Sequence, residues 1–131
     1  MAYRPLMDGK EASNAYDEHV FKIRCTFGAS SAVTYRSKDA TIAKTTTTTF
    51  TVTFPQPYAE ILSFKQGWKK ATGADPLQLQ ITTDSLTTAG TLILTSVSTN
   101  SAGTATAPAD GDVVYLEIGV SDHDLNNAFT G

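Results

Sequence analysis

The 131-residue sequence has one cysteine and two histidines, and these scarcities limit the chemistry that it can perform. A single thiol, Cys25, permits no intramolecular disulfide and supplies too few thiolates for a zinc site built by this chain alone. Cys25 shares its parity with Phe21, Ile23 and Phe27, so we expect a buried, packed thiol rather than a nucleophile. The absence of disulfides fits synthesis in a reducing cytoplasm.

Charge is also scarce. Asp, Glu, Lys and Arg make up 18% of the chain, against about a quarter in typical soluble domains. The formal net charge of −3 provides no broad attraction for DNA or RNA, so nucleic acid is not an expected partner. The nearest basic cluster is Lys65, Lys69 and Lys70 around Trp68, which we interpret as a solvated strand end.

Long apolar runs and catalytic motifs are missing as well. The first ten residues lack the apolar region of a signal peptide, and no stretch approaches the length that crosses a bilayer, so neither export nor membrane anchoring is expected. The sequence has no Gly-x-Ser-x-Gly segment and none of the glycine-rich patterns that bind phosphates or dinucleotides. We therefore predict a protein that is not an enzyme and has no cofactor.

Two segments resemble fragments of a metal site, Asp17-Glu18-His19 and Asp122-His123-Asp124. Adjacent side chains of an extended chain point to opposite sides, so neither segment alone brings three ligands to one ion. Pairing of the first and last strands would let both histidines and neighbouring carboxylates converge, but exposed polar strand ends are the preferred interpretation, and no metal is expected.

Asp110-Gly111-Asp112 also invites a comparison with calcium loops. The twelve-residue spacing of an EF-hand is absent, and calcium needs six to eight oxygen ligands. We interpret this segment as a turn that enters the following strand.

Threonine is abundant, with 21 of the 131 positions. Residues 49–54 alternate threonine with Phe50, Val52 and Phe54, which predicts a strand with one buried face and one face that carries hydroxyls and no charge. Such a face suits a particle surface or a subunit contact better than an active site. Residues 45–48 have no apolar partners at alternate positions, so regular pairing is expected to begin only near Thr49.

Eight extended segments are expected along the chain, with no convincing helix. They cover residues 20–27, 32–36, 41–43, 49–54, 60–68, 77–81, 91–97 and 113–120. Within 60–68, Leu62, Phe64 and Trp68 share one face. The last two segments begin with apolar residues on both faces, which predicts central strands or a face turned to another subunit. Turn residues separate the segments over 28–31, 71–76, 83–90 and 99–112.

This pattern predicts an all-β fold, an antiparallel β-sandwich of jelly-roll or immunoglobulin-like type with an extended N-terminal arm. The strand order stays open. The expected organisation is an arm over residues 1–19, a sandwich domain over 20–121 and a C-terminal tail over 122–131.

The arm lacks either periodicity but contains more apolar residues than a free tail of this length needs. We predict that Tyr3, Arg4, Pro5, Leu6 and Met7 take part in binding a partner. The alternative is that the arm folds back as an edge strand on its own sandwich.

Aromatic residues offer a further candidate surface. Tyr58, Trp68 and Tyr115 could line a sugar-binding surface, although aromatic residues of a sandwich more often belong to the core or to an interface.

The polar arm, the Thr/Ser/Ala-rich sandwich and the strand Thr-Phe-Thr-Val-Thr-Phe-Pro followed by Tyr58-Ala59-Glu60-Ile61 resemble the small structural proteins of tailed-bacteriophage virions. Within that group the chain looks most like the capsid decoration, or cement, proteins. The resemblance covers residues 20–121. It implies a non-enzymatic protein that binds the outer capsid surface, bridges neighbouring major capsid proteins and stabilises the head.

The same resemblance implies the location and partners of the chain. The protein would be made in the host cytoplasm and lie on the outer surface of the virion, bound to the major capsid protein. It would be a homo-oligomer, a trimer in preference to a dimer, with no nucleic-acid or membrane partner.

Two alternatives remain open. Strands with similar Thr-Phe segments occur in phage tail-fibre domains, so a receptor- or carbohydrate-binding domain of a tail fibre or spike is the second hypothesis. A secreted adhesin or pilus subunit is a third, disfavoured because no export signal is present.

Overall fold

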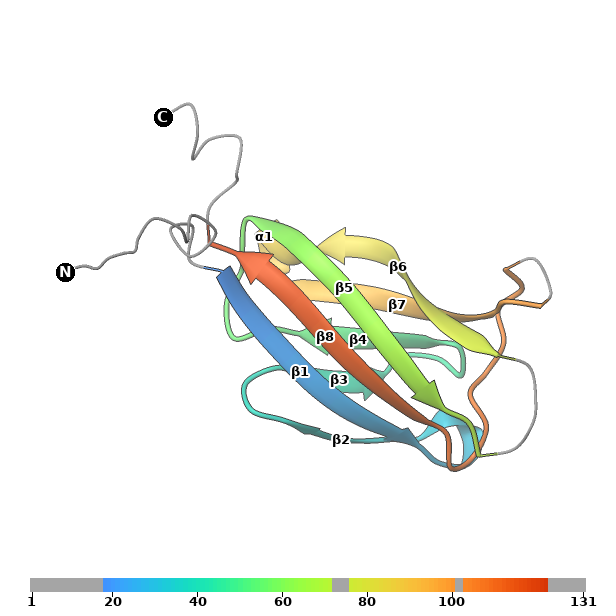
Figure 1. Cartoon of the computed structure of the whole chain (residues 1–131). Helices are drawn as coiled ribbons and strands as arrows, with labels where there is room; N and C mark the ends of the chain where they lie inside the picture. Colours follow the sequence, from blue (N-terminus) through green and yellow to red (C-terminus); the bar gives the residue numbers. More distant parts are fainter. Residues whose placement is uncertain (1–17, 72–75, 101–102, 123–131) are drawn as a thin grey trace.

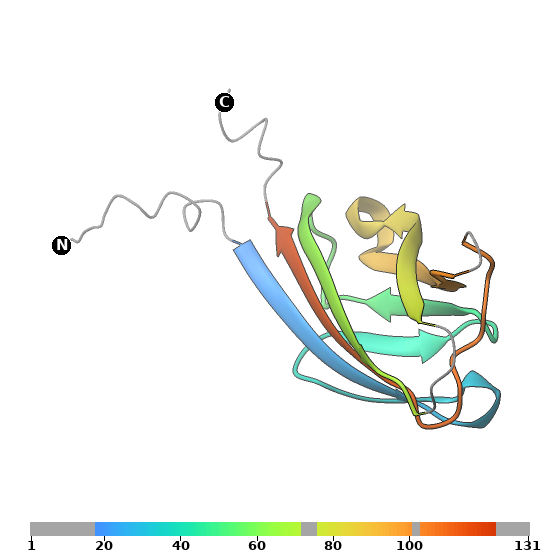
Figure 2. The same ribbon diagram turned by 45° about the vertical axis from the view of Figure 1, so that its right-hand side comes forward.

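The structure, a computed structural model, describes residues 18–71, 76–100 and 103–122. Within these residues, two four-stranded antiparallel sheets pack face to face, as Figures 1 and 2 show. The predicted all-β antiparallel sandwich is confirmed. The greater part of the predicted arm, residues 1–17, lies outside the described residues, as do residues 123–131 of the predicted tail.

The first sheet, sheet A, has the strand order β2-β1-β8-β5 and faces the viewer in Figure 1. Its strands are β1 (Glu18–Phe27), β2 (Val33–Ser37), β5 (Glu60–Lys69) and β8 (Val113–Ser121). The last of the described strands, β8, therefore lies between the first, β1, and the fifth, β5. The prediction that 113–120 forms a central strand is confirmed.

The second sheet, sheet B, has the order β3-β4-β7-β6 and lies behind sheet A in Figure 1. Its strands are β3 (Thr41–Lys44), β4 (Thr49–Thr53), β6 (Leu77–Ser85) and β7 (Thr91–Ser98). β7 is central, as its apolar residues on both faces predicted. Two short helical turns complete the described elements, η2 (Ala29–Ser31) and α1 (Leu86–Ala89).

Two predicted strand bounds differ from the structure by two residues or more, and one predicted face was wrong. β1 begins at Glu18 rather than residue 20, because Glu18 pairs with Ser121 and extends the β1–β8 ladder. β6 continues to Ser85, because residues 83–85 pair with β7, and α1 follows directly. The interval 83–90 is therefore not a plain turn.

The third error concerns Leu62. It falls at a bulge in β5, between the pairs Ile61–Val120 and Ser63–Gly119. The extra residue reverses the parity of the strand, so that Ile61 and Phe64 pack against the core while Leu62 is not among the core residues.

The core consists of the inward residues of both sheets. Phe21, Ile23, Cys25 and Phe27 on β1 meet Phe50 and Val52 on β4, and the remaining core strands contribute their own alternate residues. Two aromatic groups occupy opposite ends of this core. Phe27 contacts Phe50 and stacks on Trp68, with ring centroids 5.0 and 5.8 Å apart. Phe21 contacts Phe54 and Tyr58, at 5.0 and 5.8 Å.

The threonine run folds as expected. Residues 45–48 form the hairpin loop between β3 and β4, and regular pairing begins at Thr49. The Oγ1 of Thr46 accepts hydrogen bonds from the N–H groups of Thr48 and Thr49, at 3.3 and 3.1 Å. Hydroxyl-to-backbone bonds of this kind favour turns over strand continuation.

One side chain joins the sheets at their β5 and β6 edges. The N–H of Leu79 donates to Oε1 of Gln66 at 2.8 Å, and Nε2 of Gln66 donates to the Leu79 carbonyl at 3.0 Å. The indole N–H of Trp68 donates to the same Oε1 at 2.9 Å. The Gln66 amide thus pairs with β6 as a neighbouring strand would, and it satisfies edge groups that the sheet itself leaves open.

We predict that Gln66→Ala lowers the free energy of unfolding by about 3 kcal/mol, because the donors of Leu79 and Trp68 lose their acceptor in a partly buried site. Urea denaturation measures the change. The matched control is Gln80→Ala on the exposed side of β6, with an expected effect below about 0.5 kcal/mol. Equal losses in both variants would contradict the role given to Gln66.

Candidate functional site

The residues predicted to bind a partner, Tyr3, Arg4, Pro5, Leu6 and Met7, lie outside the described residues. Their role stays a prediction. The candidate surfaces below come from the sandwich itself.

The metal hypothesis required the first and last strands to pair, and they do. β1 and β8 are neighbours over nine residue pairs, and Nε2 of His19 lies 3.0 Å from Oδ2 of Asp122. The His19 ring also lies against Tyr58, with centroids 5.4 Å apart. Among the described residues, no three His, Cys, Asp or Glu side chains gather closely enough to hold a metal ion. Asp17, His123 and Asp124 lie outside them.

Asp112 lies in the turn that the sequence indicated, but it is fully buried. Its Oδ1 accepts from the N–H of Ala71 at 2.9 Å, and its Oδ2 accepts from the N–H of Ala109 at 2.8 Å and from Nζ of Lys70 at 2.5 Å. Lys70 also lies over the Trp68 ring, 6.0 Å from its centroid. The interpretation of Lys70 as part of a solvated strand end was therefore wrong.

The hydrogen bonds of Asp112 outweigh the cost of burying its charge. Burial raises the pKa of Asp112, but the Ala71 N–H, the Lys70 ammonium and the Ala109 N–H together bring it below the ordinary value of 3.8. The carboxylate is thus committed to holding the ends of β5 and β8 together. This is a structural role.

Cys25 is completely buried, and burial raises the pKa of its thiol to about 12. The expectation of a packed thiol is confirmed. At neutral pH the thiol stays protonated and shielded, so its protection from alkylation reports an intact sandwich.

The three aromatic residues considered for sugar binding separate in the fold. Tyr58 is buried, and Trp68 is half-buried against Phe27, so both belong to the packing. Tyr115 is 46% exposed on the outer face of sheet A. Only Tyr115 of the three therefore remains available to a ligand.

The outer face of sheet B is uncharged. Ile42, Phe50, Val52, Leu92 and Leu94 point into the core, so the residues that alternate with them point outward. We call this outer surface the threonine face; its threonines on β3, β4 and β7 are Thr41, Thr49, Thr51, Thr53, Thr91 and Thr95.

The register arranges these residues in rows across the sheet. Thr41, Thr53 and Thr91 are successive cross-strand partners, and Thr49 pairs with Thr95. The hydroxyls of Thr82 and Thr95 are 2.9 Å apart, which continues the array onto β6. No charged side chain faces outward from the alternating, described positions of β3, β4 and β7.

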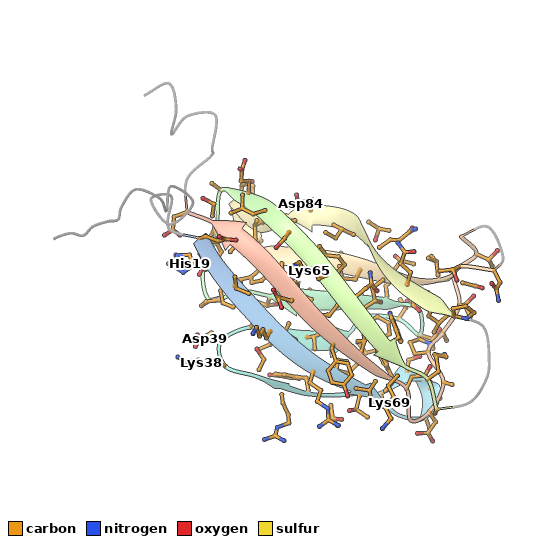
Figure 3. The ribbon with its side chains drawn as sticks, viewed as in Figure 1. His19, Lys38, Asp39, Lys65, Lys69 and Asp84 are labelled. Carbon is orange, nitrogen blue, oxygen red and sulfur yellow. The ribbon has the colours of Figure 1, made fainter. Side chains whose placement is uncertain are left out.

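The outer face of sheet A has the opposite character. A shallow groove of about 440 Å³ lies over all four strands, and we call it the cationic groove. Its principal side chains are Lys22, Arg24, Arg36, Lys65, Tyr115 and Glu117. Figure 3 shows Lys65 and Lys69 on β5, the strand that borders this face.

The sequence pointed to the threonine face but not to the groove. Lys22 and Arg24 alternate with buried residues of β1, which was a signal that the strand presents cations outward. That they meet residues of β2, β5 and β8 depends on strand order, which the sequence left open.

Comparison with protein-family models, with curated proteins and with solved structures finds no match. None of the described helices is long and apolar enough to span a membrane.

We predict that Asp112→Asn lowers the free energy of unfolding by about 3 kcal/mol at pH 7, because it leaves the partly buried Lys70 ammonium without its counter-charge. The exposed neighbour Asp110 provides the control, and Asp110→Asn should change stability by less than about 0.5 kcal/mol.

The pH dependence gives a second readout of the same variant. The folded-state pKa of Asp112 is depressed, so its contribution is present above about pH 3.8 and is lost as the pH falls through the folded-state value. The stability difference between the wild type and Asp112→Asn should shrink over that range. A difference that does not change with pH would exclude the charge as its cause.

Proposed function

We propose that this chain is a non-enzymatic capsid decoration protein of a tailed bacteriophage, which docks on the outer capsid surface and bridges neighbouring major capsid proteins. The resemblance of the sequence supplies the identity of the particle. The observation that carries the docking mode is the uncharged threonine face of sheet B.

The threonine face suits docking for three physical reasons. Each hydroxyl both donates and accepts a hydrogen bond, so it adapts to polar groups of either kind on a partner. The β-branched side chain is stiff at χ1, so little conformational entropy is lost on contact. Without charges, no ion must lose its water when the face is covered, and charged residues are depleted from the centres of interfaces for the same reason.

A decoration protein binds the capsid in many copies, so each single contact can be weak. Rows of modest hydrogen bonds and small apolar contacts suffice when subunits are linked, because a second contact then benefits from a high effective concentration. A homo-oligomer, a trimer in preference to a dimer, is therefore part of the proposal. The bound protein would lie on the outside of the virion.

The second candidate is a receptor- or carbohydrate-binding domain of a tail fibre or spike. The exposed Tyr115 in the cationic groove favours it, because aromatic rings with polar neighbours are common in ligand sites. This candidate requires no contact through the threonine face, so substitutions there separate the two functions.

We predict that the purified protein binds to capsids that lack it, saturates at a fixed number of copies per capsid and raises the temperature at which the capsids break. Thr53→Lys should weaken binding at least tenfold, because it places a solvated cation on the threonine face. Co-sedimentation measures the binding, and light scattering during heating measures the stability of the particles.

The control is Thr34→Lys, the same substitution at an exposed position of β2 on the other sheet, and it should leave binding unchanged. Protection of Cys25 from alkylation confirms that both variants are folded. Absence of binding by the wild type would overturn the decoration role. Normal binding by Thr53→Lys with loss in Thr34→Lys would move the docking surface to sheet A.

A further inference from the structure

The cationic groove is built by residues that are distant in sequence but adjacent in the register of sheet A. Arg36 on β2 is opposite Arg24 on β1, which is opposite Tyr115 on β8, which is opposite Gly67 on β5. In the neighbouring row, Glu117 on β8 lies between Lys22 on β1 and Lys65 on β5. Three strands, β1, β2 and β5, thus place cations on both sides of the exposed Tyr115 ring on β8.

Among the described residues, Arg24 and Arg36 have no acidic residue opposite them in the register, whereas Lys22 and Lys65 both lie opposite Glu117. Within the described part of the chain, Lys22, Arg24 and Arg36 form no ion pair with an acidic side chain. Lys65 and Glu117 are 3.9 Å apart, but both are well exposed, so their attraction is weak. Like charges directly opposite each other on neighbouring strands are unfavourable, as Arg24 and Arg36 are. A bound anion would relieve that repulsion.

The groove also offers a flat apolar contact. Tyr115 is one of three large hydrophobic residues that are exposed in the described structure. Beside it, Gly67 has no side chain, and a Cβ added there would meet no atom within 4 Å. The Tyr115 ring therefore borders an open shelf that can receive a ring-shaped ligand.

We propose that the cationic groove binds an acidic carbohydrate, a sugar whose ring packs on Tyr115 and whose carboxylate is held by Arg24 and Arg36. Guanidinium groups match carboxylates through paired hydrogen bonds. Glu117 accepts hydrogen bonds from sugar hydroxyls, which is a function that a site for a simple anion would not need. A groove of about 440 Å³ falls within the usual size of small-ligand sites.

The charges around the groove argue against a nucleic acid. A single strand requires a continuous positive track with several stacking aromatic residues. Here Glu117 lies inside the groove, and Glu18 and Glu60 lie farther along the same face, both opposite Ser121. A polyanion that follows the strands would meet these carboxylates. A short acidic sugar that spans the Arg24 and Glu117 rows would not reach Glu18 or Glu60.

This site goes beyond docking on a capsid and does not depend on it. The groove lies on sheet A and the threonine face on sheet B, the opposite layers in Figure 2. A subunit bound through the threonine face would keep the groove accessible, so either surface can be tested without the other.

The test is isothermal titration of the full chain with an oligogalacturonate, with the same oligomer after methyl esterification, and with a single-stranded DNA oligonucleotide of equal charge. We expect binding of the acidic sugar that weakens with added salt, at least tenfold weaker binding of the ester, and no comparable binding of DNA. Equal binding of the ester would exclude carboxylate recognition. Tighter binding of DNA would replace the proposal with a nucleic-acid site, and absence of binding by the oligogalacturonate would overturn it.

Variants locate the site. Tyr115→Ala and Arg24→Gln should each weaken binding at least tenfold. The control for Tyr115→Ala is Tyr35→Ala, because Tyr35 is also exposed but pairs with Cys25 and so does not share the face of β2 that carries Arg36. The control for Arg24→Gln is Lys38→Gln, in the turn after β2. Equal loss of affinity in a control and its partner would contradict the assignment.

Arg36→Gln separates ligand binding from a structural role. We expect it to weaken binding while leaving the melting temperature of the free protein unchanged or higher, because it removes the repulsion with Arg24. A lower melting temperature with unchanged affinity would make Arg36 a structural residue.

Discussion

The insertion of β8 between β1 and β5 is the constraint on which the remaining structure depends. Without it, sheet A would be reduced to the β1–β2 hairpin and a separate strand β5, since β8 is the neighbour that joins them. Its inward residues, Val114, Leu116, Ile118 and Val120, complete the core under β1 and β5. Its outward residues Tyr115 and Glu117 form the middle of the cationic groove. The same strand therefore completes the core and forms the cationic groove. Both require β8 to pair with β1 at the other end of the domain. Such long-range pairing costs loop-closure entropy and favours slow folding.

Polar side chains hold the two sheets together where the apolar core thins out. At the β5 and β6 edges, Gln66 substitutes for a strand. At the β2 and β3 edges, the buried hydroxyl of Ser31 donates to the Thr47 carbonyl at 2.7 Å, and Nζ of Lys44 donates to the Ser30 carbonyl at 2.6 Å. Ser30 and Ser31 have positive φ angles, a conformation that costs energy for residues other than glycine, and these two bonds help to maintain it. Because these ties and the core fix the fold, the outward positions of both sheets are free to differ.

Local periodicity was sufficient to find the eight strands and to identify two of the four central ones, β7 and β8, because burial on one or both faces determines which successive residues are apolar. Periodicity failed where the surroundings of a residue are set by segments that are distant in the sequence. Leu62 shares the apolar parity of its strand, yet a bulge set by pairing with β8 removes it from the core. In the sequence, Gln66 and Asp112 look like ordinary polar residues. Their bonding partners, Leu79 and Lys70, can be identified only once the positions of the strands are known. The threonine face could be predicted because a single strand, residues 49–53, supplies three of its threonines in strict alternation. The groove could not, because its principal side chains come from four strands and no strand supplies more than two of them.

The two outer faces differ in a way that folding does not demand. A sandwich of this size needs alternate apolar residues inward, and soluble proteins commonly fill the outward positions with mixed charges. Here the outward cations Lys22, Arg24, Arg36 and Lys65 lie on sheet A, whereas the alternating positions of β3, β4 and β7 carry none. Two faces that only contact solvent would not require this separation of charge. The separation also has a cost in stability, because it places Arg24 directly opposite Arg36. An uncharged face loses little on being covered, while an unpaired cationic face gains most from an anionic ligand that approaches from solvent. The separation therefore supports the proposal of two surfaces with different partners, a protein on the threonine face and an acidic ligand in the cationic groove.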